Sequence, residues 1–191
     1  MRKIQVLLLI LALSVAWNAQ IMVDPAASEA PPQRQHVGVD KCKVCHKNEA
    51  KGDQYSEWLG GPHAKAFKTL GSDQAKAIAK EKGIEDPQAA AECLKCHVTG
   101  HGLAAELLGP NYKKEDGVGC ESCHGAGGDY YKMKTMKAVF AGEIEPGTVG
   151  LILPDEKLCV GCHNEASPTY KKFVYADRIK QIAHPMPAQT E

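Results

Sequence analysis

Every cysteine of this 191-residue chain belongs to one of four copies of the pattern Cys-x-x-Cys-His. The copies are Cys42-Lys-Val-Cys45-His46, Cys93-Leu-Lys-Cys96-His97, Cys120-Glu-Ser-Cys123-His124 and Cys159-Val-Gly-Cys162-His163. Two thiols at this spacing can add to the two vinyl groups of one porphyrin, and the next histidine then falls under the iron as its proximal ligand. The pattern therefore predicts four covalently attached c-type haems, with eight cysteines as attachment points and four histidines as iron ligands.

Two other uses of these cysteines fit the pattern less well. Four disulfide bonds would suit an exported chain, but Cys-x-x-Cys pairs form reducible bridges that are typical of redox enzymes. Zinc ribbons also use Cys-x-x-Cys, yet they need no histidine at the next position, and here it is present in all four copies. Because no cysteine is left over, the sequence offers no obvious cysteine nucleophile or free redox thiol.

Four further histidines equal the predicted haems in number: His36, His63, His101 and His184. Neutral imidazole binds haem iron well, and distal ligands generally come from distant parts of a chain, so all four are candidate distal ligands. His101 follows His97 by four residues, so it cannot easily reach the opposite face of the same ring; it serves either a neighbouring haem or a propionate. His36 either folds back onto its own domain or reaches another subunit. Three methionines compete as axial ligands: Met133, Met136 and Met186.

The N-terminus predicts export. Arg2 and Lys3 precede an apolar run from Ile4 to Trp17, which is shorter than the about 20 residues of a membrane span and is typical of a secretory signal peptide. We expect residues 1–23 to be this signal peptide, cleaved after Ala16 or Ala19, and the protein to act in the periplasm or outside the cell. The alternative is an N-terminal anchor that is not cleaved.

The rest of the chain is predicted to be a Pro/Ala-rich arm, residues 24–37, and one tetrahaem domain, residues 38–191. Three Phe, two Trp and six Tyr make a poor aromatic core for that length, and the haems would supply the missing apolar surface. Without Arg2 and Lys3 the chain carries 21 basic and 23 acidic residues, with no basic stripe for nucleic acid. We expect redox proteins or other copies of the chain as partners, and no stable membrane span after cleavage.

The predicted architecture is mostly α-helical and loop-rich, wrapped around the haems, with little or no sheet. Ser72 and Gly83 are typical start and end residues of an Ala/Lys-rich helix. A short helix from Pro87 to Glu92 would deliver the second motif. A longer helix is expected from Ser167 to just before His184, with one apolar face made of Tyr170, Phe173, Val174 and Ile179.

Three segments resemble the tetrahaem cytochrome c-554 family. They are Gly61-Pro-His-Ala-Lys-Ala66, Cys93-Leu-Lys-Cys-His-Val-Thr-Gly100 and Gly117-Val-Gly-Cys-Glu-Ser-Cys-His-Gly125, and the likeness covers roughly residues 38–165. The resemblance implies a mostly α fold with haems in closely stacked pairs and an electron-carrying function. It also implies three bis-histidine haems and a five-coordinate haem at the second motif, and it carries His63 and His184 over as distal ligands.

One departure from that family concerns the third motif. Members have a distal histidine shortly after it, whereas this chain has no histidine between His124 and His163. The missing ligand is therefore expected from His36, His101, a methionine or another chain.

Electron transfer between redox partners is the expected function, and two alternatives stay open. In the first, the chain is a subunit of an extracellular cytochrome filament, in which a neighbouring subunit supplies an axial histidine. The tetrahaem cytochromes that form such filaments are also similar to this family. A five-coordinate haem at Cys93, Cys96 and His97 would instead reduce a nitrogen oxide, with His101 and Tyr112 as proton donors. The sequence shows no dedicated catalytic constellation, so it favours a carrier over an enzyme.

Overall fold

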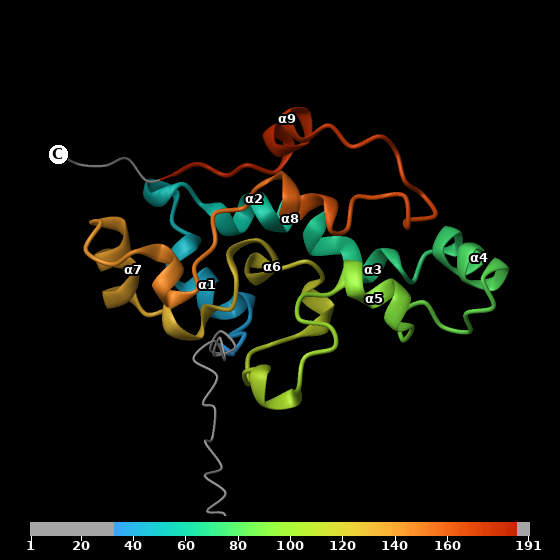
Figure 1. The fold of residues 1–191 in the computed structure, drawn as a ribbon, viewed down its shortest axis with the longest axis horizontal. Helices are drawn as coiled ribbons and strands as arrows, with labels where there is room; N and C mark the ends of the chain where they lie inside the picture. Colours follow the sequence, from blue (N-terminus) through green and yellow to red (C-terminus); the bar gives the residue numbers. More distant parts are fainter. Residues whose placement is uncertain (1–32, 187–191) are drawn as a thin grey trace, which may run out of the picture. The chain divides into compact units, whose positions relative to one another are not determined.

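Short α-helices joined by turns and extended segments make up residues 33–186, the part of the chain that the computed structural model describes (Figure 1). The helices are α1 Val39–His46, α2 Gln54–Gly60, α3 Ala66–Thr69, α4 Asp73–Glu81, α5 Ala91–His97, α6 Cys120–His124, α7 Met133–Phe140, α8 Glu156–Val160 and α9 Tyr175–Arg178. Among the described residues the only β pairing is an isolated bridge between His36 and Leu108. The predicted α-helical, loop-rich fold is confirmed, while the predicted signal peptide and residues 24–32 of the arm lie outside the described residues.

Each motif begins on a helix. In α1, α5 and α6 the helix ends at the motif histidine, whereas α8 ends at Val160 and leaves Cys162 and His163 in the turn that follows. Residues three and four positions apart share one face of a helix. Both thiols and the imidazole of a helical motif therefore project to the same side, as attachment to one porphyrin requires.

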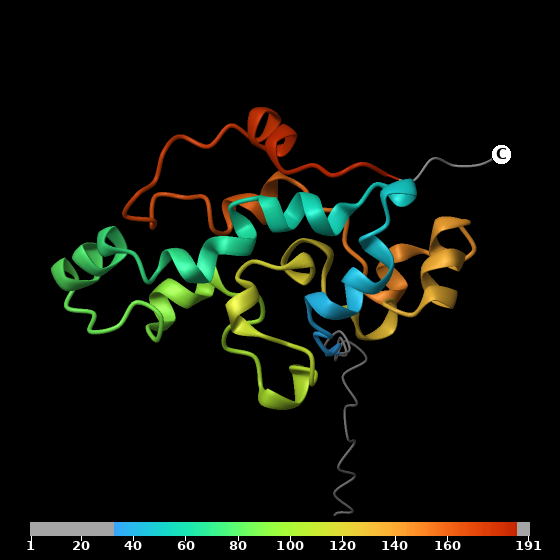
Figure 2. The ribbon, with the colours of Figure 1, turned by 180° about the vertical axis from the view of Figure 1, so that it is seen from behind.

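Two of the helices that carry motifs, α1 and α6, contact each other. Helix α1 contacts α2 and α6, and α3 contacts α5. Both ribbon views show α6 in the middle of the fold, between α1 and α5 (Figure 2). None of the helices within residues 33–186 is both long and apolar enough to cross a membrane.

Helix α4 follows its sequence prediction. The Ser72 hydroxyl caps its first turn by accepting a hydrogen bond of 3.2 Å from Ala75 N. Gly83 lies just past its end with a φ of +70°, a conformation that glycine adopts without strain.

The helix expected from Pro87 begins four residues later, at Ala91, so that prediction was wrong for residues 87–90. The reason is a turn held by Asp86. Its Oδ1 accepts a hydrogen bond from Gln88 N at 2.8 Å, and its carbonyl oxygen accepts from Ala90 N at 3.0 Å. Aspartate side chains that bind the backbone two residues ahead compete with helix formation.

The long helix expected from Ser167 is also wrong over residues 167–174, and only α9 and the 3₁₀ turn Ile179–Gln181 are helical. Val174 is extended, with φ and ψ of −118° and 104°. The Phe173 ring stacks on the ring of His163, with centres 4.9 Å apart and planes 17° apart. This tertiary contact holds the segment extended, and Tyr170 and Val174 are left exposed.

The hydrophobic core of the polypeptide is small. Leu70, Leu94 and Val98 form a buried cluster, against which Phe67 and Tyr112 pack. No side chain within residues 33–186 is completely buried. The chain thus provides little apolar interior of its own, and haem surface would be a large addition.

Glu121, inside the third motif, ties that motif to the segment that enters α1. The side chain is only 6% exposed. Its carboxylate accepts hydrogen bonds from Val37 N at 2.8 Å, Gly38 N at 2.9 Å and Gly127 N at 2.7 Å. A carboxylate is costly to bury unless N–H groups replace its hydration, and the three donors fulfil that role.

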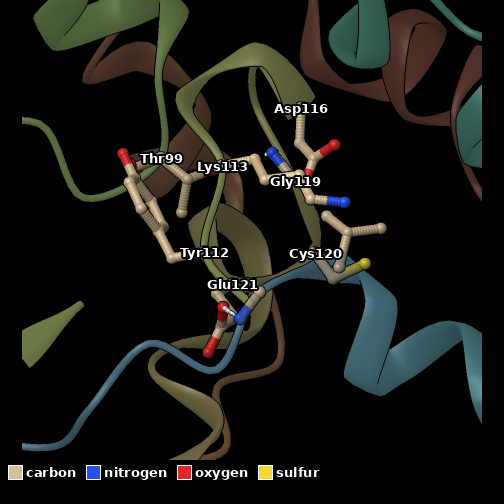
Figure 3. A pocket seen from close by; sticks show the side chains of 9 residues that line it. Thr99, Tyr112, Lys113, Asp116, Gly119, Cys120 and Glu121 are labelled. Carbon is tan, nitrogen blue, oxygen red and sulfur yellow. Dashed lines mark hydrogen bonds between the residues drawn. The ribbon is translucent and has the colours of Figure 1, made fainter. Parts of the chain in front are cut away.

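Thr99, two residues after His97, links the second motif to the third. Its Oγ1 accepts from Gly119 N at 2.7 Å and lies 2.7 Å from Ser122 Oγ and 3.1 Å from Gly117 O. Figure 3 shows Thr99 and Glu121 beside a small cavity of about 10 Å³. A cavity of this size has room for about one water molecule, so it is too small for a substrate.

Candidate haem sites

Three of the four motif histidines are oriented by an oxygen acceptor at Nδ1. The contacts are His46 Nδ1 with Gln54 Oε1 at 3.1 Å, His97 Nδ1 with Ala66 O at 2.8 Å and His124 Nδ1 with Ile152 O at 3.1 Å. These oxygens can only accept, so in each case Nδ1 carries the proton and donates it. The lone pair of Nε2 is then free for a metal, which is the usual tautomer of a ligating histidine.

Two motif histidines face a second histidine at the separation expected across an iron ion. A metal–imidazole bond is about 2.0–2.1 Å long, so two imidazoles on opposite sides of one metal ion have ring centres about 6 Å apart. The ring centres of His63 and His163 are 6.0 Å apart, and those of His124 and His184 are 5.8 Å apart. The donor set therefore fits haem iron held between two imidazoles at the third and fourth motifs.

The electrostatics of these histidines favour the neutral, metal-binding form. Burial lowers the pKa of His63, and the nearby His163 lowers it further. Burial also lowers the pKa of His124 and of His163. Neutral imidazole is the form that binds a metal ion.

The attachment cysteines come in neighbouring pairs from different motifs. None of the eight forms a disulfide bond. A hydrogen bond with Cys120 raises the pKa of Cys42, and the same bond lowers the pKa of Cys120. Burial and the adjacent Cys96 raise the pKa of Cys162 to about 11. The first motif thus lies beside the third, and the second beside the fourth; the third also lies near the fourth, since burial and the nearby Cys159 raise the pKa of Cys123.

Two short segments of the chain connect the same pairs of motifs, because each segment contacts histidines of two motifs. In one segment His63 faces His163 of the fourth motif, while the carbonyl of Ala66, three residues on, accepts from His97 of the second. A single turn of chain therefore serves the second and fourth sites.

The other segment lies at the C-terminal end of the described chain. His184 faces His124 of the third motif. The carbonyl of the next residue, Pro185, accepts a hydrogen bond from Gln54 at 2.9 Å, and Gln54 contacts His46 of the first motif. Residues 184–185 thus serve the first and third sites.

The other two candidate ligands have different surroundings. His36 has a buried Nδ1 without a hydrogen-bond partner among the described residues. Its Cδ2 would lie 3.7 Å from a Cβ placed on Gly100, just after the second motif. His101 is exposed, as are Met133 and Met186. Within residues 33–186 neither His36 nor His101 packs its ring against a motif histidine, so their roles as distal ligands stay predictions.

Sequence reasoning did not identify the groups that orient the histidines. Ala66 and Ile152 act through backbone carbonyls, which leave no trace in residue type. Gln54 and Phe173 act through side chains, but nothing in their spacing connects them to a motif, and Phe173 was assigned to a helix face. Only the fold brings them to His46 and His163.

Comparison with known proteins agrees with the chemistry of these residues. Residues 41–125, which hold the first three motifs, match the protein family described as cytochrome c554 and c-prime. Cytochrome c-554 of Nitrosomonas europaea is 36% identical over 109 residues, covering 54% of this chain and 42% of that relative. The match thus spans less than half of the relative's length, and no solved structure matches the chain. A c-type cytochrome carries covalently attached haem, which the thiols and histidines described above fit, and residues 41–125 are similar to the cytochrome c-554 family.

Proposed function

We propose that the protein is an exported electron carrier that holds four c-type haems, one at each Cys-x-x-Cys-His motif. Bound haem supplies an Fe(II)/Fe(III) couple, which is the chemistry of single-electron transfer. The chain's cysteines fix each porphyrin, and its histidines hold the iron. The observation that carries this proposal is the pair of facing imidazoles at His63–His163 and His124–His184, whose ring centres are 6.0 and 5.8 Å apart.

We further propose that the redox centres are arranged as two pairs, the first motif with the third and the second with the fourth. The thiol contacts Cys42–Cys120 and Cys96–Cys162 support this arrangement. Close centres favour electron transfer because its rate falls steeply with distance. At the third and fourth motifs, two imidazoles on the iron would also leave no open coordination position for a substrate, which favours a carrier over a catalyst there.

Export to the periplasm or the cell exterior is supported by the basic start and short apolar run at residues 2–17. Soluble or surface-bound redox proteins are the proposed donor and acceptor. A filament is less favoured, because the backbone of His36 is bound within its own chain. Its N–H donates to Leu107 O and its carbonyl accepts from Gly109 N, both at 2.8 Å.

The mass of the mature, denatured protein tests the proposal directly. Covalent haems survive denaturation, so the intact mass should exceed that of the mature polypeptide by four haem masses. Alanine replacement of Cys120 and Cys123 should remove one haem mass and leave three. Fewer than four haems on the wild-type protein would refute the proposal.

A second candidate function is reduction of a small nitrogen oxide at the second motif. It is favoured by one observation: within residues 33–186 no other histidine ring faces that of His97, which is also true of His46 in the first motif. Tyr112 is a poor proton donor for it, because burial raises its pKa and its hydroxyl donates to Thr99 O at 2.7 Å. A high-spin ferric signal that nitric oxide abolishes would support this function, and an entirely low-spin spectrum would exclude it.

A further inference from the structure

We propose that Gln54 is a positioning residue that couples the first haem site to the third. The inference rests on the proposed function, because it requires haem at both motifs. Gln54 is the first residue of α2, and its side chain is only 7% exposed. A buried amide is costly unless each of its polar atoms is hydrogen-bonded, so its partners indicate what the side chain does.

The contacts of Gln54 fix the orientation of its amide. Nε2 donates to Lys51 O at 2.5 Å and to Pro185 O at 2.9 Å. Because both partners are carbonyl oxygens, the atom that faces them must be the amide nitrogen. Oε1 therefore faces His46 Nδ1 at 3.1 Å and accepts its proton. This tautomer leaves His46 Nε2 for the iron of the first motif.

The Pro185 contact extends this effect to the third site. The residue before Pro185 is His184, whose ring faces that of His124. The chain packs tightly here, since a Cβ on Gly52 would lie 2.7 Å from Pro185 O. Movement of the Gln54 amide would thus shift His46 and the segment that carries His184 together.

Gln54 differs from the other Nδ1 acceptors because substitution can remove it. The acceptors for His97 and His124 are the backbone carbonyls of Ala66 and Ile152. An acceptor at Nδ1 makes a ligating imidazole a stronger electron donor, and stronger donation favours Fe(III) over Fe(II). The strength of the acceptor at position 54 should therefore set the reduction potential at the first motif.

The test uses the mature protein with four haems and two substitutions of opposite effect. Gln54→Leu removes the acceptor, and Gln54→Glu offers a stronger acceptor to His46 while its second oxygen repels Pro185 O. The matched controls are Gln74→Leu and Gln74→Glu, on the exposed surface of α4. Redox titration followed by optical absorption gives the potentials, and electron paramagnetic resonance reports each low-spin iron.

We expect one potential to rise in Gln54→Leu and to fall in Gln54→Glu. Each shift should change the reduced-to-oxidised ratio of that haem about tenfold, which is 59 mV for a one-electron couple. The low-spin signal of the His124–His184 site should also change in both variants. Both control variants should match the wild type. Opposite shifts from two substitutions at one position are a result that loss of packing alone does not give.

Four outcomes would overturn the inference. They are unchanged potentials in both Gln54 variants, shifts of the same sign, a change confined to the first site, and loss of covalent haem from both variants but from neither control. All four leave the four-haem carrier intact, provided that the wild-type protein retains four haem masses. Fewer haem masses on the wild type would refute the proposed function itself, so the two failures are distinguishable.

Discussion

Substitution of Thr99 by valine should destabilise the protein, because it removes the hydroxyl that joins the second motif to the third while keeping the branched shape of the side chain. Thr99 is 8% exposed. Its Oγ1 accepts from Gly119 N at 2.7 Å, and its proton can go to Gly117 O at 3.1 Å or to Ser122 Oγ at 2.7 Å. Valine can make none of these contacts.

The expected cost follows from the groups left without partners. The buried N–H of Gly119 loses its acceptor, which costs about 1–3 kcal/mol, and the loss of the hydroxyl's own hydrogen bond adds about 1 kcal/mol. The free energy of unfolding of Thr99→Val should therefore fall by about 2–4 kcal/mol. For a chain of this size such a loss lowers Tm by about 5–15 °C.

Guanidinium unfolding of the mature holoprotein, followed by far-UV circular dichroism, measures this loss. The matched control is Thr69→Val, because Thr69 is exposed and its hydroxyl donates to Lys65 O at 2.9 Å. The control should change the free energy of unfolding by no more than about 0.5 kcal/mol. If Thr99→Val cost no more than Thr69→Val, the hydroxyl would not hold the two motifs together and the reasoning would be refuted.

Three further predictions concern the histidines and the surface charges. His63→Ala and His184→Ala should each produce a high-spin ferric signal from one haem, and spectra that stay low-spin would contradict the facing imidazoles. Phe173→Ala removes the ring stacked on His163 and should lower the free energy of unfolding by about 1 kcal/mol in the same guanidinium assay; no loss would show that the stack is unimportant. Lys113 holds the pKa of Asp40 below its usual value through a hydrogen bond and through its charge, so this pair stabilises the fold above the unfolded pKa of Asp40. Near neutral pH the free energy of unfolding of Lys113→Met should be slightly smaller than that of the wild type. This difference should disappear as the pH falls through the folded pKa of Asp40, and a difference that persisted in acid would argue against the ion pair.

The parts of the fold that the sequence predicted are those fixed by local chemistry. Ser72 and Gly83 bracket α4 because a hydroxyl cap and a positive φ are local requirements. Local patterns of this kind need no knowledge of the tertiary structure.

The parts that the sequence did not predict depend on distant contacts. Nothing near Phe173 indicates that its ring packs on His163, and that contact takes the place of the helix that the spacing of apolar residues predicted. The choice of facing histidine is equally non-local, since His63 follows the first motif yet faces the histidine of the fourth. Periodicity cannot reveal an interaction between residues 100 positions apart.

The interleaving of the four sites has a consequence for how the protein must assemble. The first site is oriented by Gln54, which is bonded to Pro185, and the third faces His184, so the two sites depend on the same C-terminal segment. The second and fourth sites share residues 63–66 in the same way. Each of these sites therefore depends on residues that are distant in sequence from its own motif. The small polypeptide core adds little to hold them in place. Haem attachment needs only a local Cys-x-x-Cys-His sequence, whereas the facing histidines His63 and His184 reach their sites only in the folded chain, so attachment at the third and fourth motifs is expected to precede ligation by these two residues.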